Sequence, residues 1–198
     1  MLLGMPPFSL RAGQMGVVID PDRSGCVLDL TVGGVPALVR AGHDPDVDDG
    51  AIAVRGAFGG RPLGRLRVVE RSPVSCRLVG RDQEAGVSFL ARSEVTAGTL
   101  RYELTAVGSA SVGELSLAAC VAGWDPVSGA VIERSVEGEG VRFSAAGGLG
   151  VVVAFDEGVA VDVARDDRGA WVLTARSAAG GRSESVGLTI RVDAAGER

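Results

Sequence analysis

The sequence contains no lysine and no asparagine, and all 20 of its basic residues are arginine. This usage is typical of a GC-rich genome, so we expect a bacterial source. The net charge of the 198-residue chain is −5 at pH 7. A protein that binds nucleic acid usually carries a surplus of basic residues, so we expect no nucleic-acid partner.

Histidine and cysteine are also scarce, which excludes several kinds of metal site. His43 is the only histidine, so a zinc site built on two or three histidines is impossible. Cys26, Cys76 and Cys120 are odd in number and far apart, without a CxxC pair. This spacing fits neither a zinc site nor a disulfide framework. Each cysteine lies in an apolar stretch, which predicts three buried thiols.

Long hydrophobic runs are absent. No uninterrupted apolar run approaches the ~18 residues of a membrane-spanning helix, and the first residues lack the basic start and apolar core of a signal peptide. We therefore expect a cytoplasmic protein without a membrane partner.

Short strand-like runs fill most of the chain, and aromatic residues make up only 4% of it. Helical periodicity never holds over a long window. Regularly spaced strands with turn signals between them are typical of a sandwich or barrel. The expected strands are 15–20, 26–32, 35–40, 51–58, 63–70, 73–80, 85–91, 98–107, 113–122, 130–136, 140–145, 149–155, 159–164, 170–176 and 186–192.

These strands predict an all-β fold, and a large antiparallel β-sandwich is favoured over a closed lipocalin-like barrel. We expect one domain over 1–198, with an N-terminal lead (1–14) and a flexible tail (193–198). The segment from Leu100 to Ala106 alternates apolar and polar residues, which predicts a strand with one buried face and one solvent-exposed face. Asp166 to Gly169 predicts the turn of a hairpin over 159–175.

Two acidic segments are candidates for a calcium loop. Asp44, Asp46 and Asp48 alternate in the one long polar loop, and calcium binds six to eight oxygen ligands. The alternative is a solvated turn. The segment Asp20 to Gly25 also matches the start of a calcium loop, but it lacks the final glutamate and continues into an apolar strand, so a hairpin turn is favoured there. No other cofactor is expected.

Arginine is dense between residues 55 and 81. On a strand, Arg65 and Arg67 would share a face, where a row of guanidinium groups can bind carboxylate or phosphate. The alternative is a solvated sheet face. The seven arginines are Arg55, Arg61, Arg65, Arg67, Arg71, Arg77 and Arg81.

A tryptophan beside a carboxylate suggests sugar recognition. Trp124 and Asp125 follow a predicted strand, where the indole can stack on a sugar ring while the carboxylate accepts its hydroxyl groups. His43 is a further candidate ligand contact in its loop. Core packing is the alternative for Trp124 and for Trp171, which starts a later strand.

The order of these segments resembles the galactose mutarotase-like β-supersandwich, the fold of aldose 1-epimerases. The segment 16–40, with its Val-Pro-Ala-Leu-Val end, is similar to that family's first hairpins, and 64–79 to the strand pair that follows. Leu100–Leu104 and Gly113–Leu117 resemble its long paired strands. The resemblance implies isomerase chemistry, but the catalytic histidine and glutamate of the epimerases have no match, so no catalytic residue is assigned.

Three functions remain open. The first is a carbohydrate- or glycoside-related protein on this fold, either a diverged enzyme or a binding subunit with a sugar or other small-molecule ligand. The second is a non-catalytic assembly protein, which fits the scarcity of acid–base residues. The third is a β-barrel that holds a small hydrophobic ligand or carries out a cyclisation. Exposed strand edges would favour a homodimer.

Overall fold

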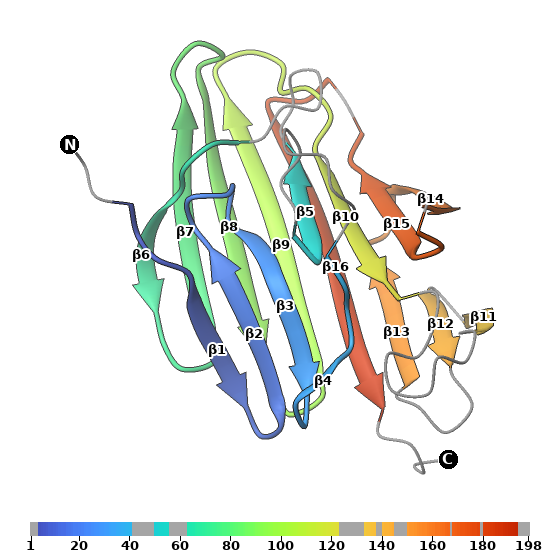
Figure 1. The fold of residues 1–198 in the computed structure, drawn as a ribbon. Coiled ribbons are helices and arrows are strands. Elements are labelled where there is room, and N and C mark those ends of the chain that lie inside the picture. The colour runs from blue at the N-terminus through green and yellow to red at the C-terminus, as the bar shows by residue number, and fades with distance from the viewer. Residues whose placement is uncertain are drawn as a thin grey trace.

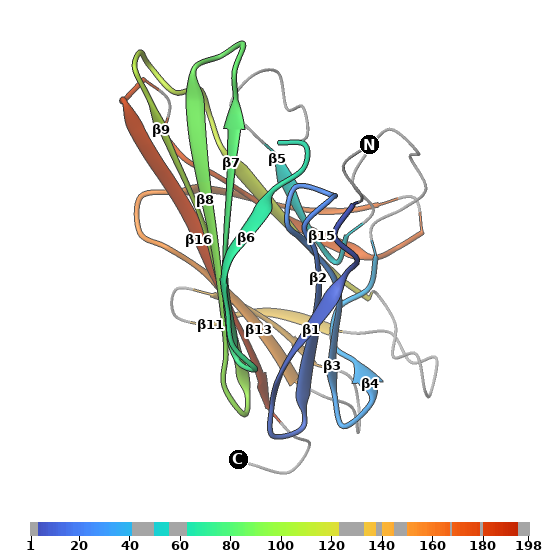
Figure 2. The same ribbon diagram turned by 90° about the vertical axis from the view of Figure 1, so that its left-hand side faces the viewer.

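The fold consists of two β-sheets packed face to face (Figures 1 and 2). The computed structural model describes residues 4–40, 50–55, 63–122, 133–137, 140–144, 150–166, 168–178 and 180–193. Within these residues every regular element is a strand, and none is a helix long and apolar enough to cross a membrane.

The front sheet of Figure 1 and the back sheet each contain eight strands, and all their pairings are antiparallel. The front sheet runs in the order β1 (Phe8–Ala12), β2 (Met15–Asp20), β3 (Cys26–Val32), β5 (Ile52–Arg55), β10 (Ser116–Val121), β15 (Trp171–Arg176) and β14 (Ala160–Arg165), and β4 (Val35–Pro36) also pairs with β3. The back sheet runs in the order β11 (Glu133–Glu137), β12 (Gly140–Ser144), β13 (Gly150–Phe155), β16 (Ser183–Asp193), β9 (Thr99–Gly108), β8 (Val87–Val95), β7 (Ser75–Asp82) and β6 (Arg67–Arg71).

Alternating side chains place the core between the two sheets. On β9, Leu100, Tyr102, Leu104 and Ala106 are all 0% exposed, while their neighbours along the strand point to the outer face. The predicted alternation is therefore confirmed. Neither strand order closes on itself, so among the described residues the front sheet ends at β1 and β14 and the back sheet at β11 and β6. The sandwich is thus confirmed, and the closed-barrel alternative is wrong.

Strand positions agree with the sequence expectation, with one omission. A strand overlaps each of the fifteen expected segments, although β4 is limited to Val35–Pro36, β8 continues to Val95 and β16 begins at Ser183. The structure adds β1, which lies in the expected N-terminal lead. The alternation of apolar and polar residues in its sequence could have predicted this strand, and the structure buries Phe8 and Leu10 and exposes Ser9 and Arg11. The positive φ of Gly13 then permits the tight turn into β2.

The turn between β2 and β3, two strands of the front sheet, packs against the back sheet. Gly25 has φ +71°, and a Cβ there would come within 2.8 Å of Leu78 on β7. The Tyr102 hydroxyl donates a hydrogen bond to the Gly25 carbonyl at 2.9 Å. Ser24 N donates to the carbonyl of Gly64. The hairpin-turn interpretation of Asp20–Gly25 is therefore confirmed.

The hairpin over 159–175 is also confirmed. β14 and β15 pair in register, with Arg165 opposite Trp171. The Asp166 Oδ1 atom accepts hydrogen bonds from the backbone N–H groups of Arg168 and Ala170. Gly169 has φ +79°, which a residue with a side chain rarely adopts. The aspartate and the glycine together close the turn.

All three cysteines are buried, as predicted. Burial raises the pKa of Cys76 to about 11, and that of Cys120 to about 11. Burial also raises the pKa of the Tyr102 hydroxyl well above its ordinary value. These groups therefore stay protonated in the folded protein at a pH where they ionise in the unfolded chain.

Replacement of Tyr102 by phenylalanine is expected to lower the free energy of unfolding by about 1–3 kcal/mol, because it leaves the buried Gly25 carbonyl without its donor. Urea denaturation at pH 7 measures this change. Val107→Ala on the same strand is the control, since its side chain is 52% exposed and a surface change usually stays within about 0.5 kcal/mol. A Tyr102→Phe value as small as the control would contradict the role of this bond.

Raising the pH is expected to destabilise the fold between about pH 9 and 11. Over this range the unfolded chain releases thiol protons that folded Cys76 and Cys120 retain, so the free energy of unfolding falls as the pH rises. Urea denaturation at pH 8, 9.5 and 10.5 measures the slope. The slope should be shallower in Cys76→Ala and Cys120→Ala than in wild type. Equal slopes in all three proteins would rule out the thiols as its source.

Candidate functional site

Three arginines converge on the outer face of the back sheet, around Val79 on β7. Arg77 and Arg81 lie two residues to either side of Val79, so all three side chains point to the same face. Arg67 on β6 pairs directly with Val79 across the strands. Val79 is therefore surrounded by three guanidinium-bearing side chains from two strands.

These arginines border a hollow of about 570 Å³, named here the arginine hollow. Val79, Leu90 and Thr105 form one row across β7, β8 and β9, and Arg67 continues that row on β6. Apolar atoms therefore make up much of the floor, while the charged groups stand at the border. The complete lining is Arg67, Arg77, Val79, Gly80, Arg81, Ser88, Phe89, Leu90, Thr105 and Val107.

The charge of the hollow is positive. Arg77 forms an ion pair with Glu70 at 3.2 Å, whereas Arg67 and Arg81 are exposed and have no ion pair with any carboxylate of the described residues. The lining contains no carboxylate, histidine or cysteine. Such a surface can bind an anion but holds no acid–base pair.

Arg65, predicted to share a face with Arg67, is directed elsewhere. β6 starts only at Arg67, so Arg65 precedes the strand and does not follow its alternation. Arg65 Nε lies 2.8 Å from Asp22 Oδ1, and the neighbouring Leu66 N donates a hydrogen bond to the Pro21 carbonyl. Arg65 therefore joins the segment before β6 to the turn after β2.

A strip of mixed charge adjoins the hollow on the same face; it includes Glu70, Arg77, Arg92, Arg101 and Glu103. Arg101 on β9 contacts Asp156 at 2.6 Å, and hydrogen bonding to this carboxylate raises the pKa of Arg101. Arg92 on β8 pairs across the strands with Arg77 and with Glu103. Carboxylates thus compensate the arginines of this strip more fully than those of the arginine hollow.

The remaining predicted site residues lie outside the described residues, namely His43, Asp44, Asp46, Asp48, Trp124 and Asp125. The calcium loop and the tryptophan–aspartate pair therefore stay predictions. Within the described part of the chain, no group of three histidine, cysteine, aspartate or glutamate side chains could hold a metal ion.

Arginine density was the sequence signal for the hollow, and alternation along β7 identifies the outward Arg77 and Arg81. The floor was missed, because Leu90 and Thr105 are far from β6 in sequence and only strand pairing brings them beside it. Arg134 and Arg165, which both contact Trp171, were also missed.

Solved structures with the same arrangement of strands are known. A candidate aldose 1-epimerase from Escherichia coli K12 matches with a TM-score of 0.73 and 13% identity, over 96% of this chain and 99% of that one. The galactose mutarotase related enzyme of Lactobacillus acidophilus matches with a TM-score of 0.68 and 9% identity, over 96% and 98% of the two chains. This chain has the galactose mutarotase-like fold.

The same fold occurs as part of larger proteins. A heparinase III matches with a TM-score of 0.63 and 12% identity, over 98% of this chain but only 35% of that protein. No protein-family model matches the sequence, and no curated protein is similar to it. The likeness therefore lies in the mutarotase-like fold, and the predicted resemblance is confirmed at that level.

Proposed function

We propose that this protein binds a carbohydrate bearing a carboxylate or phosphate group, and that the arginine hollow receives the anionic group. The observation that carries the proposal is the placement of Arg67, Arg77 and Arg81 around the apolar Val79. A guanidinium group can donate two parallel hydrogen bonds to a carboxylate or phosphate.

The composition of the hollow suits such a ligand. The C–H groups of a sugar ring can lie on Val79 and Leu90, while the hydroxyls of Ser88 and Thr105 in the lining supply donors and acceptors. The mutarotase-like fold supports the choice of a carbohydrate, because its solved members include proteins described as aldose 1-epimerase and heparinase III. A binding role is favoured over catalysis at this surface, since its lining holds no acid–base pair.

Isothermal titration calorimetry with glucose, galactose, glucuronate, galacturonate and glucose 6-phosphate tests the proposal. At least one anionic sugar should bind, and its neutral parent should bind at least about tenfold more weakly, because a hydrogen bond to a charged group contributes about 1.5–3 kcal/mol. Affinity should fall between 50 and 500 mM salt, because salt screens charges on an exposed face.

Variants locate the site. Arg67→Gln combined with Arg81→Gln should weaken binding by about tenfold or more without loss of stability, because neither side chain has an ion-pair partner in the described part of the chain. Arg11→Gln removes an exposed arginine from β1 of the front sheet and serves as the matched control. The proposal fails if no anionic sugar binds, or if the double variant binds as tightly as Arg11→Gln.

A further inference from the structure

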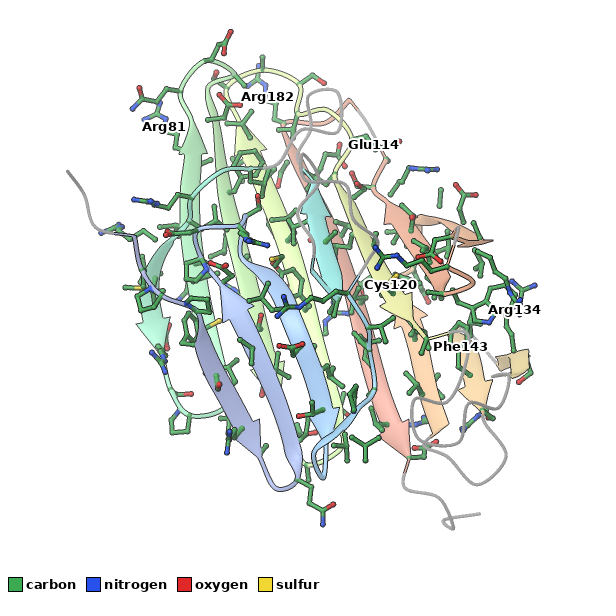
Figure 3. All side chains as sticks on the ribbon, viewed as in Figure 1. Arg81, Glu114, Cys120, Arg134, Phe143 and Arg182 are labelled. Carbon is green, nitrogen blue, oxygen red and sulfur yellow. The ribbon has the colours of Figure 1, made fainter. Side chains whose placement is uncertain are left out.

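A second group of arginines lies at the opposite edge of the sandwich, where β14 is the edge strand of the front sheet and β11 that of the back sheet (Figure 1). Figure 3 shows Arg134 and Phe143 at this edge, across the molecule from Arg81. Trp171 on β15 contributes its indole ring between the sheets, and its centroid is 6.3 Å from that of the buried Phe143. The site therefore combines residues of both sheets.

Two guanidinium groups stack on this one indole. Arg165 lies opposite Trp171 in the β14–β15 pair, and its Cζ atom is 4.2 Å from the ring centroid. Arg134 lies opposite Phe143 in the β11–β12 pair, and its Cζ atom is 4.7 Å from the same centroid. The front sheet thus supplies one cation and the back sheet supplies the other.

The two charges are close together. Both Cζ atoms lie within 4.7 Å of one centroid, so they are at most about 9 Å apart. Both side chains are exposed, and neither forms an ion pair with a carboxylate whose side chain the structure describes, which leaves out Glu133 and Glu137. Stacking occupies the face of a guanidinium and leaves its in-plane N–H donors available.

The indole adds an unsatisfied donor. Trp171 Nε1 is buried and has no acceptor among the residues that the structure describes. A buried N–H group normally has a hydrogen-bond partner, and lacking one is unfavourable. An acceptor oxygen brought to this edge of the indole would satisfy the donor.

We propose that Arg134, Arg165 and Trp171 form a second ligand site, which binds an oxyanion of the phosphate type. Two planar guanidinium groups at most about 9 Å apart supply more donors than one carboxylate can accept, whereas a phosphate or pyrophosphate offers enough oxygens. The site is separate from the arginine hollow and does not depend on the function proposed there. Its ligand can be a free phosphate or a phosphate group on a sugar.

Tryptophan fluorescence tests this site directly. In a Trp124→Phe background Trp171 is the sole tryptophan, and its emission is followed during titration with sodium phosphate or sodium pyrophosphate. Sodium chloride at matched ionic strength is the control. A saturable change with the phosphates alone is expected, with pyrophosphate the tighter ligand. Glucose 6-phosphate is titrated next, and tighter binding than free phosphate would identify a phosphosugar as the ligand.

Variants of Arg134 and Arg165 distinguish phosphate binding from a purely structural role, in which the two side chains only cover the Trp171 ring. Arg134→Gln combined with Arg165→Gln should weaken phosphate binding by about tenfold or more, while Arg67→Gln with Arg81→Gln should leave it unchanged. If the first variant does not fold, Arg134→Lys with Arg165→Lys keeps both charges but loses the planar fork, and binding should still weaken.

Two results would overturn the proposal. The first is a wild-type response to the phosphates no larger than that to sodium chloride. The second is unchanged phosphate affinity in a folded variant of Arg134 and Arg165. The arginine hollow is tested by calorimetry on other variants. Failure of the proposal for one site therefore does not contradict the proposal for the other.

Discussion

The hydrogen bond from Tyr102 to the Gly25 carbonyl fixes how the two sheets meet. It holds the turn after β2 against the inner face of the back sheet, where the φ of +71° and the close approach to Leu78 favour glycine at position 25. The same turn accepts the Leu66 N–H at Pro21 and pairs Asp22 with Arg65. These contacts set where β6 begins, and β6 carries Arg67 to its place opposite Val79. The arginine hollow on the outer face therefore depends on a contact in the core.

Local patterns were enough to locate the strands, but not to pair them. Alternation in the segment Leu100–Ala106 and the Asp166 turn each depend on neighbouring residues, and both were predicted correctly. Sandwich and barrel share the same local periodicity, so only the pairing order could decide between them. β1 was overlooked because its short alternation was interpreted as an unstructured lead.

The candidate sites were less predictable for the same reason. Arg65 and Arg67 were expected to share a face, but the strand starts one residue after Leu66, and Arg65 turns toward Asp22. The contacts of Arg134 and Arg165 with Trp171 join β11 to the β14–β15 hairpin; the hairpin was predicted, but the sequence does not show that β11 lies beside it. Arginine density alone could indicate the hollow, because its cations are close together in the sequence.

The absence of lysine has a consequence for how these surfaces respond to acidity. A guanidinium group remains protonated throughout the physiological range, so the charge of the arginine hollow does not change with pH. Any pH dependence of anion binding there reflects the ligand's own ionisation. A phosphate monoester would lose affinity below about pH 6, and a sugar acid only near pH 4. The pH profile of binding can thus identify the anionic group by its acid strength.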